Sequence, residues 1–287
     1  MSLKVAFLSN KLTLRGSEVA LYDYAHYNET LLGNESFIVT RDVDRIRHEF
    51  DVSLEAYERF AKRFGRLLFY ESMTDIERHI QEQGIDVLYI IKSGEPHDGL
   101  ITTKCRCVVH AVFNPTRPHG DRFAVIHEQL NKLFGTRVPV VPYIVALPSQ
   151  EDLPDLRQAL GIAVTAVVFA RYGGNESFDI PWVQETVVHV AGRHPEICFV
   201  FLNTWRFGPP MPNVLFLAGT SDVKRKVQLI RASSALLHGR ARGETFGLTC
   251  GEFASQGKPV ITYAGSPEKG GIFERCANRR KAVYPLG

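Results

Sequence analysis

The 287-residue chain carries 34 lysine and arginine residues against 31 aspartate and glutamate residues, which leaves a formal net charge of +3 at pH 7. Because the charges nearly balance, electrostatics gives no signal for nucleic acid as a partner. Hydrophobic residues make up 45% of the sequence, which predicts a globular protein. No run of about 18 apolar residues occurs, so the sequence excludes a membrane-spanning helix.

The N-terminal residues lead directly into a strand-like run and lack the pattern of a signal peptide. The five cysteines are odd in number, and Cys105-x-Cys107 has no second pair at metal-binding spacing. These features favour buried thiols in a reducing compartment, and we expect a cytoplasmic protein.

In the first half of the chain, short apolar runs alternate with helical segments. Ser17 is the expected N-cap of a helix that ends near Gly33, and a second helix from about Thr74 stops at Gly84. We expect parallel strands over residues 4–9, 36–40, 85–91, 107–113 and 139–144.

Residues 59–66 form the densest basic stretch of the sequence. Phe60, Phe64 and Leu67 recur there at helical spacing, which favours an amphipathic helix. Contact between this basic face and an acidic membrane surface stays open as an alternative, so a peripheral membrane contact is kept among the partners.

Residues 147–154 are polar and contain two prolines, which indicates a linker. After this linker we expect strands over residues 165–170, 197–202, 213–217, 234–237 and 259–263, and helices over residues 180–191, 223–232 and 245–255. Strands that alternate with helices predict parallel sheets covered on both faces. The sequence therefore predicts two Rossmann-like, doubly wound α/β domains, residues 1–147 and 148–287, that face a cleft at the carboxyl ends of their strands.

The most informative segment, residues 242–261, reads RGETFGLTCGEFASQGKPVI. Glu244 lies in the loop before the expected helix and Glu252 about two turns inside it, so both can face one ligand at the helix start. The backbone N–H groups around Phe246, Gly247 and Leu248 suit an anion such as phosphate. A carboxylate suits the hydroxyls of a sugar or a ribose.

This segment resembles the E-x7-E signature of the GT-B glycosyltransferases of family 4. Its first part matches the loop of that family, with Thr245 where glycine is usual. Its second part matches the helix, with Phe253 where alanine is usual, and the residues from Gly257 match the entry to the next strand. The resemblance implies a GT-B fold and transfer of a sugar, with retention, from a nucleoside diphosphate sugar to an unknown hydroxyl acceptor.

The resemblance also implies roles for single residues. Glu244 would contact the transferred sugar, and Glu252 would hold the ribose hydroxyls. Arg171, directly after the first expected strand of the second domain, would neutralise the diphosphate. The family's usual lysine, several residues later, is missing here. Arg240 or Arg242, in the loop before Glu244, is the alternative second cation.

Two glycine-containing turns are further candidates. Gly173 and Gly174 allow the backbone to approach the donor closely, and a tight strand-to-helix turn is the alternative interpretation. Gly16 and Ser17 occupy the position of the family's first glycine loop and could approach the donor phosphate or the acceptor. A plain helix cap is the alternative for this pair.

Two histidines stand near expected strand ends. His110, late in the strand over residues 107–113, lies where members of the resembled family often carry a histidine that reaches the transferred sugar. A buried core histidine is the alternative. His238 is a secondary candidate, because it precedes Gly239 and Arg240 at the end of another strand.

Several expectations concern what is missing from the sequence. Apart from Asp42-x-Asp44, in the first half of the chain, no Asp-x-Asp motif occurs, so we expect neither a metal nor another cofactor. The first strand lacks Gly-x-Gly-x-x-Gly, which argues against a dehydrogenase. The chain ends at Gly287, earlier than the family usually does, so we expect a shortened C-terminus, and cover by a second subunit in a homo-oligomer stays open. A sugar-nucleotide epimerase and a non-catalytic nucleotide-sugar-binding module remain as alternative functions.

Overall fold

A computed structural model describes residues 2–96, 100–148, 153–266 and 283–286 of the chain. The chain divides into two compact units, unit 1 (Met1–Ile144) and unit 2 (Val145–Gly287). The predicted domain boundary, after residue 147, falls in the segment that follows Ile144. Residues 149–152 of the predicted linker, and Cys276, lie outside the described residues.

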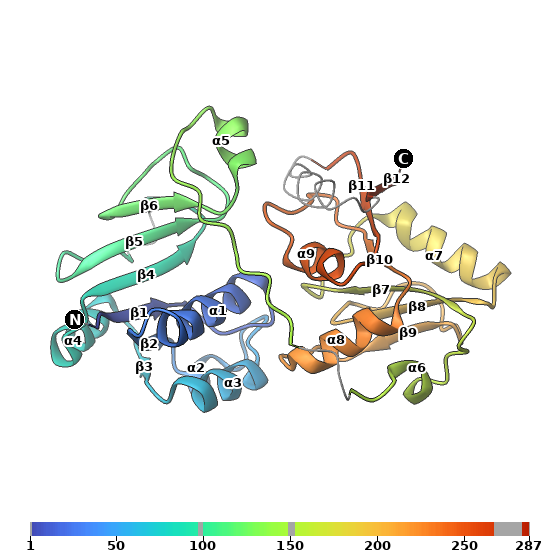
Figure 1. The fold of residues 1–287 in the computed structure, drawn as a ribbon, viewed down its shortest axis with the longest axis horizontal. Coiled ribbons are helices and arrows are strands. Elements are labelled where there is room, and N and C mark those ends of the chain that lie inside the picture. Colours follow the sequence, from blue (N-terminus) through green and yellow to red (C-terminus); the bar gives the residue numbers. More distant parts are fainter. Residues whose placement is uncertain (1, 97–99, 149–152, 267–282, 287) are drawn as a thin grey trace. The chain divides into compact units, whose positions relative to one another are not determined.

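Unit 1 is a parallel sheet between helices (Figure 1). Its strands are β1 (Lys4–Leu8), β2 (Glu35–Thr40), β3 (Leu67–Phe69), β4 (Val87–Lys92), β5 (Arg106–Ala111) and β6 (Arg122–Val125). Its helices are α1 (Gly16–Thr30), α2 (Val43–Ile46), α3 (Leu54–Phe64), α4 (Met73–Gln83) and α5 (Glu128–Phe134). The strand order is β3-β2-β1-β4-β5-β6, and the described pairings are parallel.

Alternation of side chains along the strands of unit 1 fills two core layers. Phe7 and Ile38 pack with Leu21 of α1 and Phe60 of α3 on one face. On the other face, neighbouring residues of the same strands pack with Ile76 and Ile80 of α4. Helices on both faces make the unit doubly wound, as predicted.

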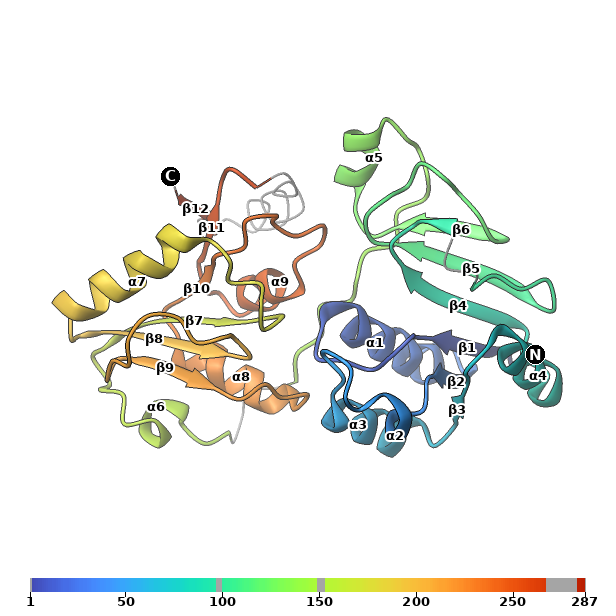
Figure 2. The same ribbon diagram turned by 180° about the vertical axis from the view of Figure 1, so that it is seen from behind.

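Unit 2 repeats this arrangement (Figure 1, Figure 2). Its strands are β7 (Val167–Tyr172), β8 (Ile197–Leu202), β9 (Val214–Leu217), β10 (Ala235–His238), β11 (Val260–Tyr263) and β12 (Val283–Leu286). Its helices are α6 (Leu156–Ala159), α7 (Pro181–Arg193), α8 (Val223–Ala232) and α9 (Leu248–Ser255). The order β12-β11-β10-β7-β8-β9 is that of unit 1 with the strands renumbered.

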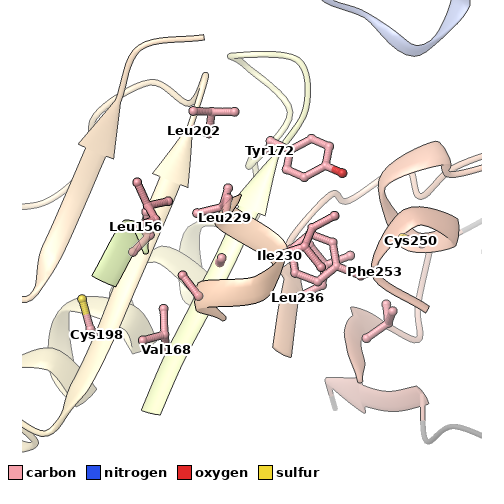
Figure 3. Packing of buried hydrophobic residues seen from close by; sticks show 14 of the residues in the cluster. Leu156, Val168, Tyr172, Cys198, Leu202, Leu229, Ile230, Leu236, Cys250 and Phe253 are labelled. Carbon is pink, nitrogen blue, oxygen red and sulfur yellow. The ribbon is translucent and has the colours of Figure 1, made fainter. Parts of the chain in front are cut away.

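The two faces of the unit 2 sheet again carry separate cores. Leu229 and Ile230 of α8 and Phe253 of α9 pack on Val168 and Leu236 of the strands, as Figure 3 shows. The helix α7 covers the opposite face, where its side chains pack with those of β8 and β9. The predicted fold class, two doubly wound α/β units, is confirmed.

In a sheet with this strand order, successive strands are added toward one edge and then, from the middle, toward the other edge. The change occurs between the two central strands. These are β1 and β4 in unit 1 and β7 and β10 in unit 2. Ligands of open parallel sheets bind at this switch point, beyond the carboxyl ends of the strands. In unit 2 the switch point lies at the loops after β7 and β10. The loop after β10 contains Glu244 and leads into α9, which contains Glu252.

Some local predictions for unit 1 are wrong. Residues 139–144 do not form a strand, because Pro139 and Pro142 have no N–H to donate. A single parallel bridge between Val125 and Val140 stands there among the described residues. Ser17 is not the N-cap of α1: Arg15 takes that position and the Ser17 hydroxyl donates to Glu18 instead.

Two predictions for unit 2 shift by a few residues. Arg171 lies inside β7 rather than after it, because the pairing with β8 extends as far as Tyr172 and Leu202. The helix predicted over residues 245–255 begins at Leu248, because Gly247 adopts a left-handed conformation with φ of 71°. Glu252 is therefore about one turn inside α9 rather than two.

The basic stretch of unit 1 is part of an amphipathic helix as far as Phe64, with Phe60 and Phe64 buried as predicted. The prediction is wrong for Leu67, because Gly65 ends the helix in a left-handed conformation and Leu67 begins β3. The Arg59 guanidinium lies 3.8 Å from the centre of a tyrosine ring of α1, that of Tyr22. Arg63 pairs with Glu29 at 2.7 Å. In the part of the chain that the structure describes, no helix is both long and apolar enough to cross a membrane.

Candidate functional site

Glu244 is the centre of a charged network beyond the end of β10. Its Oε1 accepts a hydrogen bond from Arg240 at 2.8 Å and lies 3.5 Å from Nε2 of His238. The other ring nitrogen of His238 lies 2.9 Å from the hydroxyl of Thr262 on the neighbouring strand β11. Because a carboxylate can only accept, Nε2 of His238 carries the proton that faces Glu244.

The charge on Glu244 is stabilised by this network. Burial alone would raise the pKa of Glu244, but the hydrogen bond from His238 and the positive charge of Arg240 lower it to about 2. The side chain is still 29% exposed, so a ligand can reach it. An ionised, partly open carboxylate suits ligand hydroxyl groups as hydrogen-bond donors.

Glu252 lies deeper, with 5% of its surface exposed. Its Oε2 accepts a hydrogen bond of 2.5 Å from the hydroxyl of Tyr172, the last residue of β7. The hydroxyl of Thr249, in the first turn of α9, donates to the carbonyl of Tyr172 at 3.2 Å. These two hydrogen bonds connect the end of β7 to α9, and one of them is made by the carboxylate of Glu252.

Arg171 points into the loop that follows β7. Its guanidinium donates to Ser177 at 2.6 Å, to the carbonyl of Gly174 at 3.1 Å, and to Thr204. The residue is 3% exposed, and burial lowers its pKa to about 10 although the charge of Glu244 opposes this. Arg171 is therefore cationic at neutral pH and orders the Gly173–Gly174 turn that was predicted to approach a donor.

Glycines shape the loop between β10 and α9. A side chain at position 239 would overlap the ring of Phe178, so the loop after β10 requires a glycine there. Gly243 and Gly247 both have positive φ, of 83° and 71°. With Gly247 as the N-cap, α9 begins at Leu248, and the cap residue has no side chain that could accept from the first N–H groups of the helix. Thr245 and Phe246 lie in the loop, and Phe246 is buried.

In unit 1 the predicted residue His110 lies in β5 and is 1% exposed. Its Nδ1 lies 2.7 Å from the Tyr89 hydroxyl, and the rings of Tyr24, Tyr89 and Tyr143 lie between 5.6 and 6.1 Å from its ring. We call these three residues the tyrosine cluster. Burial lowers the pKa of His110 to about 4, offset only in part by the backbone of Val141. The imidazole is neutral at pH 7.

Gly16 and Ser17 form the first turn of α1, at the carboxyl end of β1. Beside them the carboxyl group of Glu18 accepts hydrogen bonds from Thr13 at 2.5 Å and from Ser17 at 2.9 Å. Burial raises the pKa of Glu18. The turn therefore brings a serine hydroxyl and a buried carboxyl group to the end of the central strand of unit 1.

The structure thus brings Arg171, Gly173, Gly174, Arg240, Glu244 and Glu252 together at the carboxyl end of one sheet. Sequence reasoning missed Tyr172, which contacts Glu252, and Thr262, which contacts His238 beside Glu244. Tyr172 follows the strand predicted over residues 165–170, and Thr262 lies near the end of the strand predicted over residues 259–263, which was an available signal. Their partners, however, are 80 and 24 positions away in the chain. Among the described residues, no group of three His, Cys, Asp or Glu side chains could hold a metal ion.

Solved structures share this fold. A glycosyltransferase from Rickettsia africae matches with a TM-score of 0.67 at 12% identity, over 95% of this chain and 81% of that chain. Anabaena Alr3699/HepE in complex with UDP and glucose matches with a TM-score of 0.67 at 16% identity, over 95% and 82%. A proposed UDP-N-acetylglucosamine 2-epimerase from Listeria monocytogenes matches with a TM-score of 0.57 at 12% identity, over 96% and 82%.

No protein-family model and no curated protein sequence matches the chain. The likeness to solved structures confirms the predicted GT-B fold.

Proposed function

We propose that the chain is a glycosyltransferase that moves a sugar from a nucleoside diphosphate sugar to a hydroxyl acceptor. One observation carries the proposal. Glu244 and Glu252, eight positions apart in the sequence, both lie at the carboxyl end of the unit 2 sheet, beside the switch point between β7 and β10. This is where open parallel sheets bind nucleotides.

In the proposed donor site, each charge has a task. Glu252 accepts from the ribose hydroxyls, and Glu244, held ionised by Arg240 and His238, accepts from the transferred sugar. The N–H groups at the start of α9 and the cation of Arg240 stabilise the charge that grows on the leaving diphosphate. Arg171 adds positive charge and orders the glycine turn.

Unit 1 is proposed to bind the acceptor. Gly16 and Ser17 bring the start of α1 to the end of β1, and a neutral His110 can accept or donate a hydrogen bond. We further propose that His110 helps the acceptor hydroxyl to react. Unit 2, residues 148–287 in the predicted division, is then the donor side.

Two finer points belong to the proposal. Retention at the anomeric carbon is implied by the resemblance of residues 242–261 to family 4. Metal independence is supported by the positive charge that Arg171 and Arg240 provide near Glu244, because protein cations can take over the task of a divalent ion. Anabaena HepE, solved with UDP and glucose, supports a nucleotide sugar as the ligand of this fold.

A product assay with a panel of labelled UDP-, GDP- and ADP-sugars tests the function. We expect release of the nucleoside diphosphate and appearance of the label in an acceptor. Conversion of the sugar nucleotide into its epimer would contradict transfer and support the epimerase alternative, which the Listeria monocytogenes structure represents on the same fold. Binding of a donor without turnover, across a wide set of acceptors, would support the binding-module alternative.

The remaining partners stay predictions. A homo-oligomer is tested by light scattering of the purified chain. Peripheral membrane contact is tested by flotation with vesicles that contain anionic lipid, and the cytoplasmic location by fractionation of cells.

A further inference from the structure

Helix α8 carries a charged residue at a core position. The helix buries Val227, Leu229 and Ile230 against the sheet, and Lys226 belongs to the same buried side with 6% of its surface exposed. Removing an ammonium group from water is unfavourable unless nearby groups compensate for the lost hydration. An alkyl side chain would pack there without this cost, so the lysine needs an explanation that core packing does not provide.

Tyr172 is one of the groups that face this lysine. The Nζ atom of Lys226 lies 5.5 Å from the centre of the Tyr172 ring, within the range of a cation–π interaction. The ring also packs against Phe253 of α9, with 5.8 Å between the ring centres. Figure 3 shows the ring at the end of β7 with its hydroxyl turned toward α9. Tyr172 is therefore held in a single orientation by two helices.

The Tyr172 hydroxyl donates a hydrogen bond to the carboxylate of Glu252. The bond to Oε2 measures 2.5 Å, and both residues are buried, with 6% and 5% exposure. Burial, followed by the charge of Glu252, raises the pKa of Tyr172 well above its ordinary value. The phenol therefore stays protonated and donates a hydrogen bond to the carboxylate. The structure gives Oε1 of Glu252 no hydrogen bond to any described residue. One oxygen is occupied by the protein and the other is left for a ligand.

We propose that Tyr172 is a positioning residue that holds Oε2 of Glu252 so that Oε1 faces the ribose hydroxyls of the donor, with Lys226 balancing the buried carboxylate from beneath the ring. This rests on the proposed function, in which Glu252 binds the ribose. It adds a requirement for two residues that lie outside the E-x7-E segment, one on β7 and one on α8.

The test compares two ligands in isothermal titration calorimetry: the nucleoside diphosphate of the preferred donor and its 2′,3′-dideoxy analogue, which lacks the ribose hydroxyls. Tyr172→Phe removes the hydroxyl and keeps the ring. We expect this variant to bind the nucleoside diphosphate about tenfold more weakly than the parent, because a hydrogen bond to a charged group is lost. Binding of the dideoxy analogue should stay within about twofold of the parent.

A double-mutant cycle separates positioning from a general loss of packing. In a Glu252→Gln background, Tyr172→Phe should add little further loss, because the two changes act on one contact. Tyr57→Phe is the matched control: it removes another buried tyrosine hydroxyl, bonded to Thr40 at 3.1 Å in unit 1, and should leave both affinities unchanged. Lys226→Met keeps the alkyl stem, and its loss of affinity should again be confined to the ligand with ribose hydroxyls.

Three outcomes would overturn the proposal. Unchanged affinity of Tyr172→Phe for the nucleoside diphosphate would remove Tyr172 alone and leave the proposed function intact. Equal losses for both ligands would mean that the hydroxyl only stabilises the fold. A parent protein that binds both ligands equally would refute the ribose role of Glu252, and this proposal with it.

Discussion

The two units have the same strand order, but the side chains at the carboxyl ends of their sheets differ in kind. In unit 2 these ends carry ions: Glu244 with a pKa of about 2, and Arg171, which stays cationic. In unit 1 the imidazole of His110, with a pKa of about 4, is neutral and is surrounded by the tyrosine cluster, and burial raises the pKa of Glu18.

This difference shows how one architecture can present two different sets of side chains at its sheet ends. The topology places loops at the switch point of each sheet, and the residues in those loops decide what can bind there. Compensated charges in unit 2 suit an anionic, hydroxyl-rich ligand such as a nucleotide sugar. The neutral imidazole of His110 among aromatic rings in unit 1 suits an uncharged acceptor. The following predictions test this division, starting with the largest expected effect.

Replacing the central charge of unit 2 should be the most damaging change. Glu244→Gln removes the carboxylate that Arg240 and His238 stabilise and should reduce turnover by roughly 10²- to 10³-fold, a loss typical for a group that acts on the transition state. Steady-state kinetics with the preferred donor measures it. The control is Glu196→Gln, an exposed glutamate paired with His194 before β8, which should stay fully active. An active Glu244→Gln enzyme would remove Glu244 from the site.

In unit 1, His110→Ala should reduce turnover by roughly 10²-fold if the imidazole takes part in proton transfer. Nucleotide affinity should barely change, because the donor is assigned to unit 2. Val109→Ala, at the neighbouring buried position of β5, controls for loss of packing: it should lower the melting temperature and leave turnover intact. If His110→Ala behaves like this control, His110 is only a core residue.

The neutral imidazole of His110 also predicts that the stability of unit 1 depends on pH. The pKa of His110 is about 4 in the folded unit and 6.5 in its ordinary state, so the unfolded chain binds more protons between these values. The stability contributed by the neutral ring should therefore be complete above pH 6.5 and fall toward pH 4, by on the order of 3 kcal/mol. Amide hydrogen exchange of β4 and β5 measures the change, and a His110→Phe protein with the same pH profile would contradict it.

A comparison of Arg171 with Arg157 distinguishes an arginine of the proposed donor site from one that only stabilises the fold of unit 2. Arg171→Lys keeps the charge but cannot make all the bonds to Gly174, Ser177 and Thr204, so we expect donor affinity to fall by about tenfold. Arg157→Lys is the control, because Arg157 donates to backbone carbonyls such as that of Ala232 and should affect only the melting temperature. Equal behaviour of the two variants would assign Arg171 a purely structural role.

The smallest expected effect concerns metal ions. If protein cations balance the diphosphate in unit 2, activity should be unchanged in EDTA and should not rise on addition of Mg²⁺ or Mn²⁺. Initial rates with and without the chelator decide this. Loss of activity in EDTA that is restored by either ion would mean that the phosphate-stabilising role has been assigned to the wrong groups.

Much of the architecture could be read from local patterns. The strand over residues 197–202 and the helix over residues 223–232 have the predicted bounds, because each is a continuous apolar or amphipathic run with clear ends. The alternation of such runs was enough to predict two doubly wound units. The pair Glu244 and Glu252 was also found from the sequence, since one short segment contains both.

Other features depended on contacts between distant residues. The short strands β3 and β6 have too few residues for a pattern and exist because a neighbouring strand provides the hydrogen bonds. Residues 139–144 are apolar like a strand, but two prolines prevent a ladder. The start of α9 was decided by the left-handed Gly247, which the sequence pattern alone did not distinguish from the first helical turn.

The sequence by itself determined which residues could carry charge, where the apolar runs lie and which segment contains the two glutamates, because these properties are local. Only the tertiary structure decided how those charges are held. Tyr172 and Glu252 meet across 80 positions, and His238 meets Thr262 because β10 and β11 pair in register. Burial then sets the pKa of His110 and Arg171, and burial is a property of the packed units rather than of any stretch of sequence.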